Sequence, residues 1–210
     1  MSDQRTRTAQ ENFWAGEFGT AYAARHAGDH LLASRVHFLS QALRRAGPIR
    51  SCLELGASIG TNLRAMRLLF PDAALKAVEI NPAAAQQLGA MIGPDNVTLT
   101  SIQDYTAAEQ FDLVLLRGVL IHVAPDTLAA VYDTIHRASG RLILLAEYYN
   151  PTPVSVPYRG HADRLFKRDF AGELLDRHPG MTLRDYGFVY HRDPAFPQDD
   201  ITWFLLERQP

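Results

Sequence analysis

The chain has 210 residues, of which 47% are hydrophobic and 21% charged, a composition that leaves little room for long disordered tracts. The formal net charge of −2 excludes a bulk attraction to nucleic acid, and the lone cysteine, Cys52, excludes an internal disulfide. Residues 1–10 contain no apolar signal segment, and no apolar stretch approaches the ~20 residues of a membrane span. We therefore expect one cytoplasmic domain over 1–210, with no nucleic-acid or membrane partner.

The pattern of residues 1–147 predicts helices followed by an alternation of strands and helices. Two helices are expected over 8–27 and 29–46, broken at Gly28 and closed by Gly47-Pro48. Strands are then expected at 51–55, 75–80, 97–100, 111–116 and 142–147, and helices at 60–70, 82–91 and 126–138. This alternation favours a parallel sheet with helices on both faces, because each parallel connection must cross over the sheet.

The pattern changes after residue 147. Pro151, Pro153 and Pro157 exclude a helix interior or a central strand, so this segment is expected to be an insertion. A helix at 169–178 and strands at 181–190 and 201–207 follow, with a connector at 191–200 short enough for an antiparallel hairpin. The prediction is an α/β, Rossmann-like, mostly parallel sheet with an antiparallel C-terminal hairpin. Its parts are a helical cap (1–47), a core (48–147), an insertion (148–168) and a C-terminal helix and hairpin (169–210).

A glycine-containing turn follows the first expected strand. Glu54-Leu55-Gly56 ends that strand, and a second glycine, Gly60, precedes the next helix. Glycine at both positions allows backbone N–H groups to approach a ligand, and the carboxyl end of the first strand is where open α/β sheets bind ligands. The dinucleotide fingerprint would place glycines where Ser58 and Thr61 stand, which disfavours a pyrophosphate. The turn suits a ligand without phosphates, such as the amino-acid end of S-adenosylmethionine.

An acidic residue, Glu79, ends the next strand, 23 positions after Gly56. A carboxylate there can accept hydrogen bonds from both ribose hydroxyls of a nucleoside. Taken alone, Glu79 could equally be a solvated acid at a strand end. The turn and the acid at adjacent strand ends together predict a nucleoside-cofactor site.

Three strings in the core carry a resemblance. Glu54 to Gly60, Val78-Glu79-Ile80-Asn81 and Phe111-Asp112-Leu113-Val114 are similar to class I S-adenosylmethionine-dependent methyltransferases over residues 50–145. The resemblance implies S-adenosylmethionine as cofactor and S-adenosylhomocysteine as product. It implies that the methionine end lies on Glu54, Gly56, Ala57 and Gly60, the ribose on Glu79, the adenine on Ser101 and Ile102, and the sulfonium on the backbone of Arg117 and Gly118. Further candidate cofactor residues are Asn62, Ile80 and, from the helical cap, Tyr22. The family often has an acid where Ser101 stands, and Asp104 is the alternative.

A narrower resemblance covers nearly the whole chain. The strings that carry it are Phe13 to Gly19, Ala146 to Pro151, Pro157 to His161, Asp163 to Phe170 and Asp199 to Phe204. They look like the methylases associated with pseudaminic acid biosynthesis. The resemblance implies a bacterial surface-sugar setting and methyl transfer to an O or N atom of a small anionic acceptor, a nonulosonic acid or its precursor.

The segment after Glu147 is expected beside the cofactor turn, because the carboxyl ends of parallel strands open on the same side. It is rich in basic and aromatic side chains and contains one acid, Asp163. Arginine forks suit a carboxylate or phosphate, although a solvated basic surface would have the same composition. The candidate acceptor-binding residues are Tyr148, Tyr149, Tyr158, Arg159, His161, Arg164 and Arg168, with Arg25 and Tyr22 as lid residues of the cap.

A base is needed only if the acceptor is a hydroxyl, since methyl transfer to an amine chiefly requires positioning. His122 follows the fourth strand and is the first candidate, although it could equally be a packing histidine; Glu147 and His191 are the alternatives. No H-E-x-x-H or C-x-x-C spacing supports a metal. Two other functions use the same features: an NAD-linked oxidoreductase on the same sheet, and a binding protein that has the cofactor fold without turnover.

Overall fold

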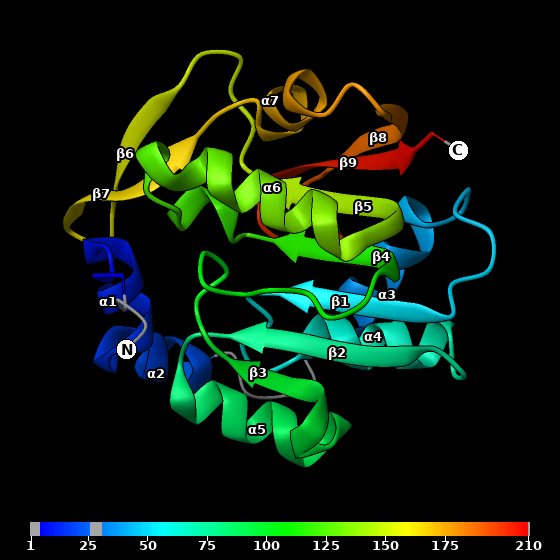
Figure 1. Ribbon diagram of the computed structural model, residues 1–210, viewed down its shortest axis with the longest axis horizontal. Coiled ribbons are helices and arrows are strands. Elements are labelled where there is room, and N and C mark those ends of the chain that lie inside the picture. Colours follow the sequence, from blue (N-terminus) through cyan, green and yellow to red (C-terminus); the bar gives the residue numbers. More distant parts are fainter. Residues whose placement is uncertain (1–4, 26–30, 210) are drawn as a thin grey trace.

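The computed structural model describes residues 5–25 and 31–209, and their centre is a seven-stranded sheet in the order β3-β2-β1-β4-β5-β9-β8 (Figure 1). The strands are β1 (Ser51–Leu55), β2 (Ala74–Glu79), β3 (Val97–Leu99), β4 (Phe111–Arg117), β5 (Ser139–Glu147), β8 (Met181–Val189) and β9 (Ile201–Arg208). The first five pair in parallel, and β9 runs antiparallel between β5 and β8. The predicted α/β sheet with an antiparallel C-terminal hairpin is therefore confirmed.

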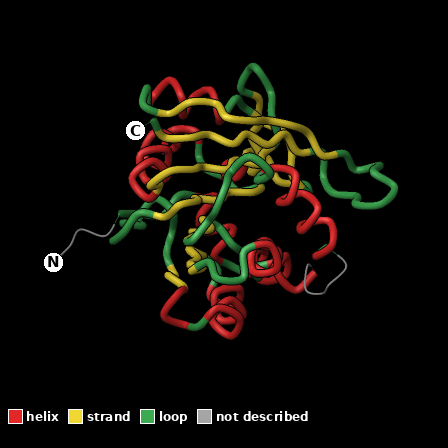
Figure 2. The backbone as a smooth tube through the Cα atoms, turned by 90° about the vertical axis from the view of Figure 1, so that its right-hand side faces the viewer, coloured by secondary structure: helices red, strands yellow, loops and turns green. Residues whose placement is uncertain are grey.

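Helices cover both faces of the sheet, as the continuous apolar runs of the parallel strands require. On one face lie α3 (Leu32–Ala42), α4 (Thr61–Leu69) and α5 (Pro82–Ile92); on the other lie α6 (Leu128–Ala138) and α7 (Phe170–Arg177). Figure 2 shows helices (red) on two sides of the strands (yellow). Consecutive β4 residues alternate between the two cores: Leu115 packs in the first and Val114 in the second, both fully buried.

The N-terminal cap differs from the expected single helix over 8–27. It consists of α1 (Ala9–Ala15) and α2 (Glu17–Arg25), which are separated at Gly16, where the backbone is extended. The two helices approach closely, because a Cβ on Gly19 would lie 1.9 Å from the carbonyl oxygen of Trp14. The predicted break at Gly28 lies outside the described residues. The second helix, expected to reach residue 46, ends at Ala42.

The insertion contains a hairpin that the sequence did not predict: β6 (Val154–Tyr158) pairs antiparallel with β7 (His161–Lys167). Pro157 is tolerated because the register shifts between Val156 and Tyr158, and a bulge needs no N–H at that position. Arg159 and Gly160 form the turn, and both have positive φ (49° and 83°). Figure 1 places the hairpin next to α1, at one end of the sheet.

Smaller differences concern the ends of elements. The fifth strand begins at Ser139 rather than residue 142, and the helix expected from residue 126 is preceded by a 3-10 turn, η3 (Pro125–Thr127). Two further 3-10 turns are η1 (Pro94–Asn96) and η2 (Leu120–His122). The second of these follows β4 and carries His122 to the carboxyl edge of the sheet.

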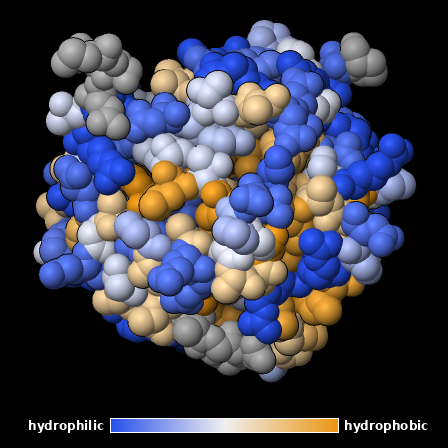
Figure 3. All heavy atoms as spheres, turned by 60° about the horizontal axis from the view of Figure 1, so that its bottom comes forward, coloured by the Kyte–Doolittle hydropathy of each residue, from blue (hydrophilic) through white to orange (hydrophobic). Residues whose placement is uncertain are grey.

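The surface mixes polar and apolar side chains, as in most globular proteins. Figure 3 shows hydrophobic residues (orange) scattered among hydrophilic ones (blue) on one face. Of the helices in the described part of the chain, none has the length and apolar character needed to cross a membrane.

Candidate active site

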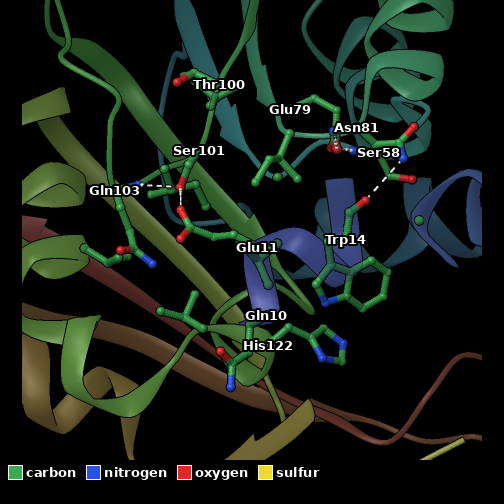
Figure 4. A pocket seen from close by; sticks show the side chains of 18 of the residues that line it. Gln10, Glu11, Trp14, Ser58, Glu79, Asn81, Thr100, Ser101, Gln103 and His122 are labelled. Atoms are coloured by element: carbon green, nitrogen blue, oxygen red, sulfur yellow. Dashed lines mark hydrogen bonds between the residues drawn. The ribbon is translucent and has the colours of Figure 1, made fainter. Parts of the chain in front are cut away.

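A pocket opens at the carboxyl ends of the parallel strands, beneath α1 and α2 (Figure 4). Each of β1 to β4 contributes the residues that follow it, and the cap contributes the opposite wall. The lining includes Gly56, Ser58, Glu79, Ile80, Asn81, Ser101, Ile102, Arg117, Gly118, Val119 and His122 from the core, and Glu11, Trp14, Gly19 and Tyr22 from the cap. Of the predicted cofactor residues, Gly56, Glu79, Ile80, Ser101, Ile102, Arg117, Gly118 and Tyr22 therefore lie in one pocket.

The two glycines of the turn have different surroundings. Gly56 lines the pocket with a φ of 74°, and a Cβ there would lie 2.8 Å from a Val119 methyl. Gly60, with a φ of 81°, begins α4 outside the lining, where a Cβ would lie 2.4 Å from the terminal methyl of Met91. The sequence interpretation gave both glycines to the ligand. In the structure Gly60 faces α5, so close helix packing accounts for it.

Glu79 is fixed at the end of β2 by the backbone. Its two carboxylate oxygens accept N–H bonds from Ser58 and Asn81, each at 2.7 Å. Ser58 has a φ of 50°, which turns its N–H toward β2. Burial raises the pKa of the Glu79 carboxyl, although these N–H groups oppose the shift. The result is a buried carboxylate of fixed orientation facing the pocket.

Glu54 and Asn62 form a buried pair beneath the turn. Asn62 Nδ2 donates to Glu54 Oε1 at 2.6 Å, whereas Glu54 Oε2 and Asn62 Oδ1 have no partner. Burial raises the pKa of Glu54 to about 8. Neither residue lines the pocket, and neither does Ala57. Their unpartnered oxygens leave hydrogen-bonding capacity just below the turn.

At the other end of the pocket, Ser101 is bonded to a residue of the cap. Its hydroxyl donates to Glu11 and accepts the N–H of Gln103 at 3.1 Å (Figure 4). Glu11 also accepts two bonds from Arg5, at 2.5 and 2.9 Å. Burial opposes ionisation, but the bonds from Arg5, Ser101 and Thr8 lower the pKa of Glu11 to about 2. The acid at this end of the pocket is therefore Glu11.

Asp104, the alternative acid at this end, is oriented differently. Its carboxylate pairs with Arg5 at 3.0 Å and lies outside the pocket lining. Arg5 therefore bridges two acids, with Glu11 on the pocket side. The acid that lies next to Ser101 is therefore Glu11 of the cap and not Asp104 of the loop after β3.

His122 lies between the cap and the hairpin. Its ring centroid is 4.6 Å from that of Trp14 and 5.0 Å from that of Tyr158. Nδ1 is 2.6 Å from the carbonyl oxygen of Arg164, which can only accept, so Nδ1 carries the proton and Nε2 is left as an acceptor. Burial lowers the pKa of His122 to about 4. The imidazole is neutral near neutral pH, with a defined tautomer.

The two other candidate bases do not line the pocket. Glu147 is buried and accepts the N–H groups of Val119, Leu120 and Ile121 at 3.0 to 3.4 Å. It therefore holds η2, the turn that carries His122. His191 is exposed in the β8–β9 connector and bonds Asp200 at 2.9 Å.

Several solved structures share this fold. A methyltransferase of Leishmania major described as SAM-dependent superposes with a TM-score of 0.70 at 15% identity, over 94% of this chain and 81% of that one. The 1,6-didemethyltoxoflavin-N1-methyltransferase of Burkholderia thailandensis gives 0.68 at 19%, over 99% and 93%, and the magnesium protoporphyrin IX methyltransferase of Synechocystis gives 0.67 at 12%, over 98% and 100%. The chain shares the Rossmann-like fold of these methyltransferases. No family model and no curated protein matches the sequence.

The basic residues of the insertion do not converge on the pocket of this methyltransferase fold. Arg168 pairs with Glu173 at 2.7 Å, Arg164 stacks over Phe13, and Arg159 stacks over its neighbour Tyr158. The predicted acceptor residues that lie outside the pocket lining are Arg25, Tyr148, Tyr149, Tyr158, Arg159, His161, Arg164 and Arg168. Anion binding by this cluster therefore stays a prediction, and in the structure Arg159, Arg164 and Arg168 contact other side chains of the chain.

Among the pocket residues that the sequence interpretation missed, two polar ones, Glu11 and Asn81, connect the cap to the core. Glu11 belongs to a capping box with Thr8 at the start of α1, a spacing that is visible in the sequence. Asn81 caps α5 through its oxygen and donates through Nδ2 to the carbonyl oxygens of Trp14 and Gly16, each at 3.2 Å. Its place before Pro82 indicates the helix cap, but nothing local indicates the bond to the N-terminal helices. In the described ranges, no group of three or more His, Cys, Asp or Glu could hold a metal ion.

Proposed function

We propose that the chain is an S-adenosylmethionine-dependent methyltransferase. The observation that carries the proposal is Glu79, a buried carboxylate that two backbone N–H groups orient at the end of β2, facing a pocket that begins at the Gly56 turn. A carboxylate in this position suits the two hydroxyls of a ribose. The methyltransferase fold supports the same interpretation.

The residues present fit this cofactor at three points. Glu79 would accept the ribose hydroxyls, and Ser101 and Ile102 would flank the adenine, with Glu11 behind them. Beneath the turn, the unpartnered oxygens of Glu54 and Asn62 are suited to the ammonium of an amino acid. When bound, S-adenosylmethionine supplies an electrophilic methyl group on a sulfonium.

The remaining work of this chain is to exclude water and to place the acceptor atom. Trp14 and Tyr22 close the cap side of the pocket, and the neutral His122 presents Nε2 as an acceptor. For a hydroxyl acceptor, His122 would take the proton. For an amine acceptor, His122 would only orient the N–H.

For the acceptor, we propose a small anionic molecule, a nonulosonic acid of the pseudaminic type or its precursor, methylated on O or N. The support is the set of strings between Phe13 and Phe204 that resemble methylases associated with pseudaminic acid biosynthesis. Several of these strings fall on the cap, the β6–β7 hairpin and the β8–β9 connector.

Calorimetry tests the donor part of the proposal. We expect S-adenosylhomocysteine to bind and NAD to give no heat. If NAD alone binds, the proposed methyltransferase function is wrong and an NAD-linked oxidoreductase is favoured. Transfer of labelled methyl from S-adenosylmethionine into a lysate of nonulosonic-acid-producing cells tests turnover. A lysate that yields no labelled sugar at saturating protein would contradict the sugar acceptor and favour a binding protein.

A further inference from the structure

Two arginines from distant parts of the chain meet at one glutamine. Arg35 of α3 donates to Gln198 Oε1 at 2.6 Å, and Arg117 at the end of β4 donates to the same oxygen at 3.3 Å. Gln198 lies in the β8–β9 connector and is only 8% exposed. A single neutral oxygen thus holds two guanidinium groups side by side.

These cations have no carboxylate partner within the ranges 5–25 and 31–209. No ion pair there includes Arg35 or Arg117, although most other interactions of arginine in this protein are with acids or carbonyl groups. Arg117 Nε and Gln198 Nε2 are buried and have no hydrogen-bond partner. Because buried donors are nearly always paired, two unpaired donors in one cluster indicate a missing acceptor.

The electrostatics of the cluster also indicate a missing acceptor. Burial and the neighbouring Arg117 lower the pKa of Arg35 to about 9, and burial lowers the pKa of Arg117. With a pKa of about 9, the Arg35 guanidinium still carries its proton near neutral pH. The acids that interact with them are Glu54 and Glu147, which are buried and whose pKa values burial raises to about 8 and about 7, and Asp199, which is exposed. None of these acids forms an ion pair with either guanidinium among the described residues, so an anion bound here would supply the direct partner that the two cations lack.

The cluster is continuous with the pocket, because Arg117 lines it next to Gly118. We propose that Arg35, Arg117 and Gln198 form a binding site for a carboxylate of a pocket ligand. Two guanidinium groups and one amide N–H present planar donors, which suit the two oxygens of a carboxylate. This site takes the place of the anion-binding cluster that the sequence predicted on the hairpin.

Two ligands of the proposed function carry such a group, and the identity of the occupant rests on that function. One is the amino-acid end of the cofactor, and the nearby Glu54 favours it. The other is the carboxylate of a nonulosonic acid, the acceptor class of the proposed function. The chemistry of the site is the same in both cases.

Acetate is the probe that tests the site without knowledge of the acceptor. In the full chain, we expect acetate to shift the NMR signals of the Nε–Hε groups of Arg35 and Arg117 saturably, whereas acetamide, its neutral isostere, leaves them unchanged. Arg35→Gln should weaken acetate binding about tenfold, as loss of a charged hydrogen bond predicts. Arg45→Gln, a change at an exposed arginine just after the same helix, is the matched control.

The same titration with saturating S-adenosylhomocysteine separates the two sources. Loss of the acetate response assigns the site to the cofactor carboxylate, and its persistence assigns the site to the acceptor. If neither arginine signal moves saturably in the ligand-free protein, the proposal is overturned. A protein that binds acetate here but no S-adenosylhomocysteine would retain the carboxylate site and lose the proposed function.

Discussion

The two sides of the pocket are built in different ways. On the side proposed to bind the methyl donor, here called the donor side, Glu79 ends β2 and its carboxylate accepts the backbone N–H of Ser58, which follows the neighbouring β1. On the side proposed to bind the acceptor, here called the acceptor side, the His122 ring is hydrogen-bonded to the carbonyl oxygen of Arg164 in the hairpin and packs against Trp14 of the cap. Adjacent strand ends define the first side, and three separate segments define the second. The donor side is thus a property of the sheet, and the acceptor side a property of what is attached to it.

This difference determines how each side should respond to mutation. Residues at a strand end are part of the packed sheet, so a substitution there should lower the free energy of unfolding as well as ligand affinity. Side chains on the cap and the hairpin contact fewer neighbours, so their replacement should lower the free energy of unfolding by less.

The largest effect is expected for Gly56→Ala. The added Cβ would lie 2.8 Å from Val119 and would sit on a residue with a φ of 74°. Backbone strain and overpacking together should lower the free energy of unfolding by about 2–4 kcal/mol, as measured by urea denaturation. Gly47→Ala is the matched control, because its φ is 68° but nothing lies within 4 Å. Equal losses in the two variants would show that contact with Val119 has no part in the effect.

Next in size is Glu79→Ala, which removes the carboxylate assigned to the ribose. Loss of charged hydrogen bonds should weaken binding of S-adenosylhomocysteine by about 10- to 100-fold in calorimetry. Glu109→Ala, which removes an exposed acid paired with Lys76, should leave the affinity unchanged. An unaltered affinity in Glu79→Ala would contradict the ribose assignment.

The donor side could be predicted from sequence because its signals are local. Gly56 and Glu79 mark the ends of two apolar strands, and the parallel sheet brings strand ends together without further information. Glu11 and Gln198 could not be found in this way, since their partners Ser101 and Arg35 are far away in the chain. Composition also indicated a basic insertion, but it carried no sign that Glu173 would pair with Arg168.

A third prediction concerns Glu147, which supports η2 on the acceptor side. Burial raises its pKa from 4.5 to about 7. A raised pKa in the folded state gives a contribution to stability that is present below the unfolded pKa and lost as the pH rises through 7. Relative to Glu147→Gln, wild type should therefore lose about 1–3 kcal/mol of unfolding free energy between about pH 5 and about pH 8.

Thermal and urea unfolding of the two proteins at both pH values measure this loss. Glu109→Gln is the control, since its side chain is exposed and should track wild type at both values. If the difference between wild type and Glu147→Gln is the same at both pH values, Glu147 does not titrate in this range and the burial argument is wrong.

The smallest effect is expected at the tip of the hairpin, for Arg159→Asn. Arg159 has a φ of 49° and precedes Gly160 with a φ of 83°, which is the backbone of a two-residue turn that favours Asn-Gly. The substitution should raise the free energy of unfolding by about 0.5 kcal/mol. Because Arg159 lies outside the pocket lining, binding of N-acetylneuraminic acid, a nonulosonic acid, should be unchanged. If Arg159→Asn loses that binding, the anionic group of the acceptor is bound by the hairpin and not by Arg35 and Arg117.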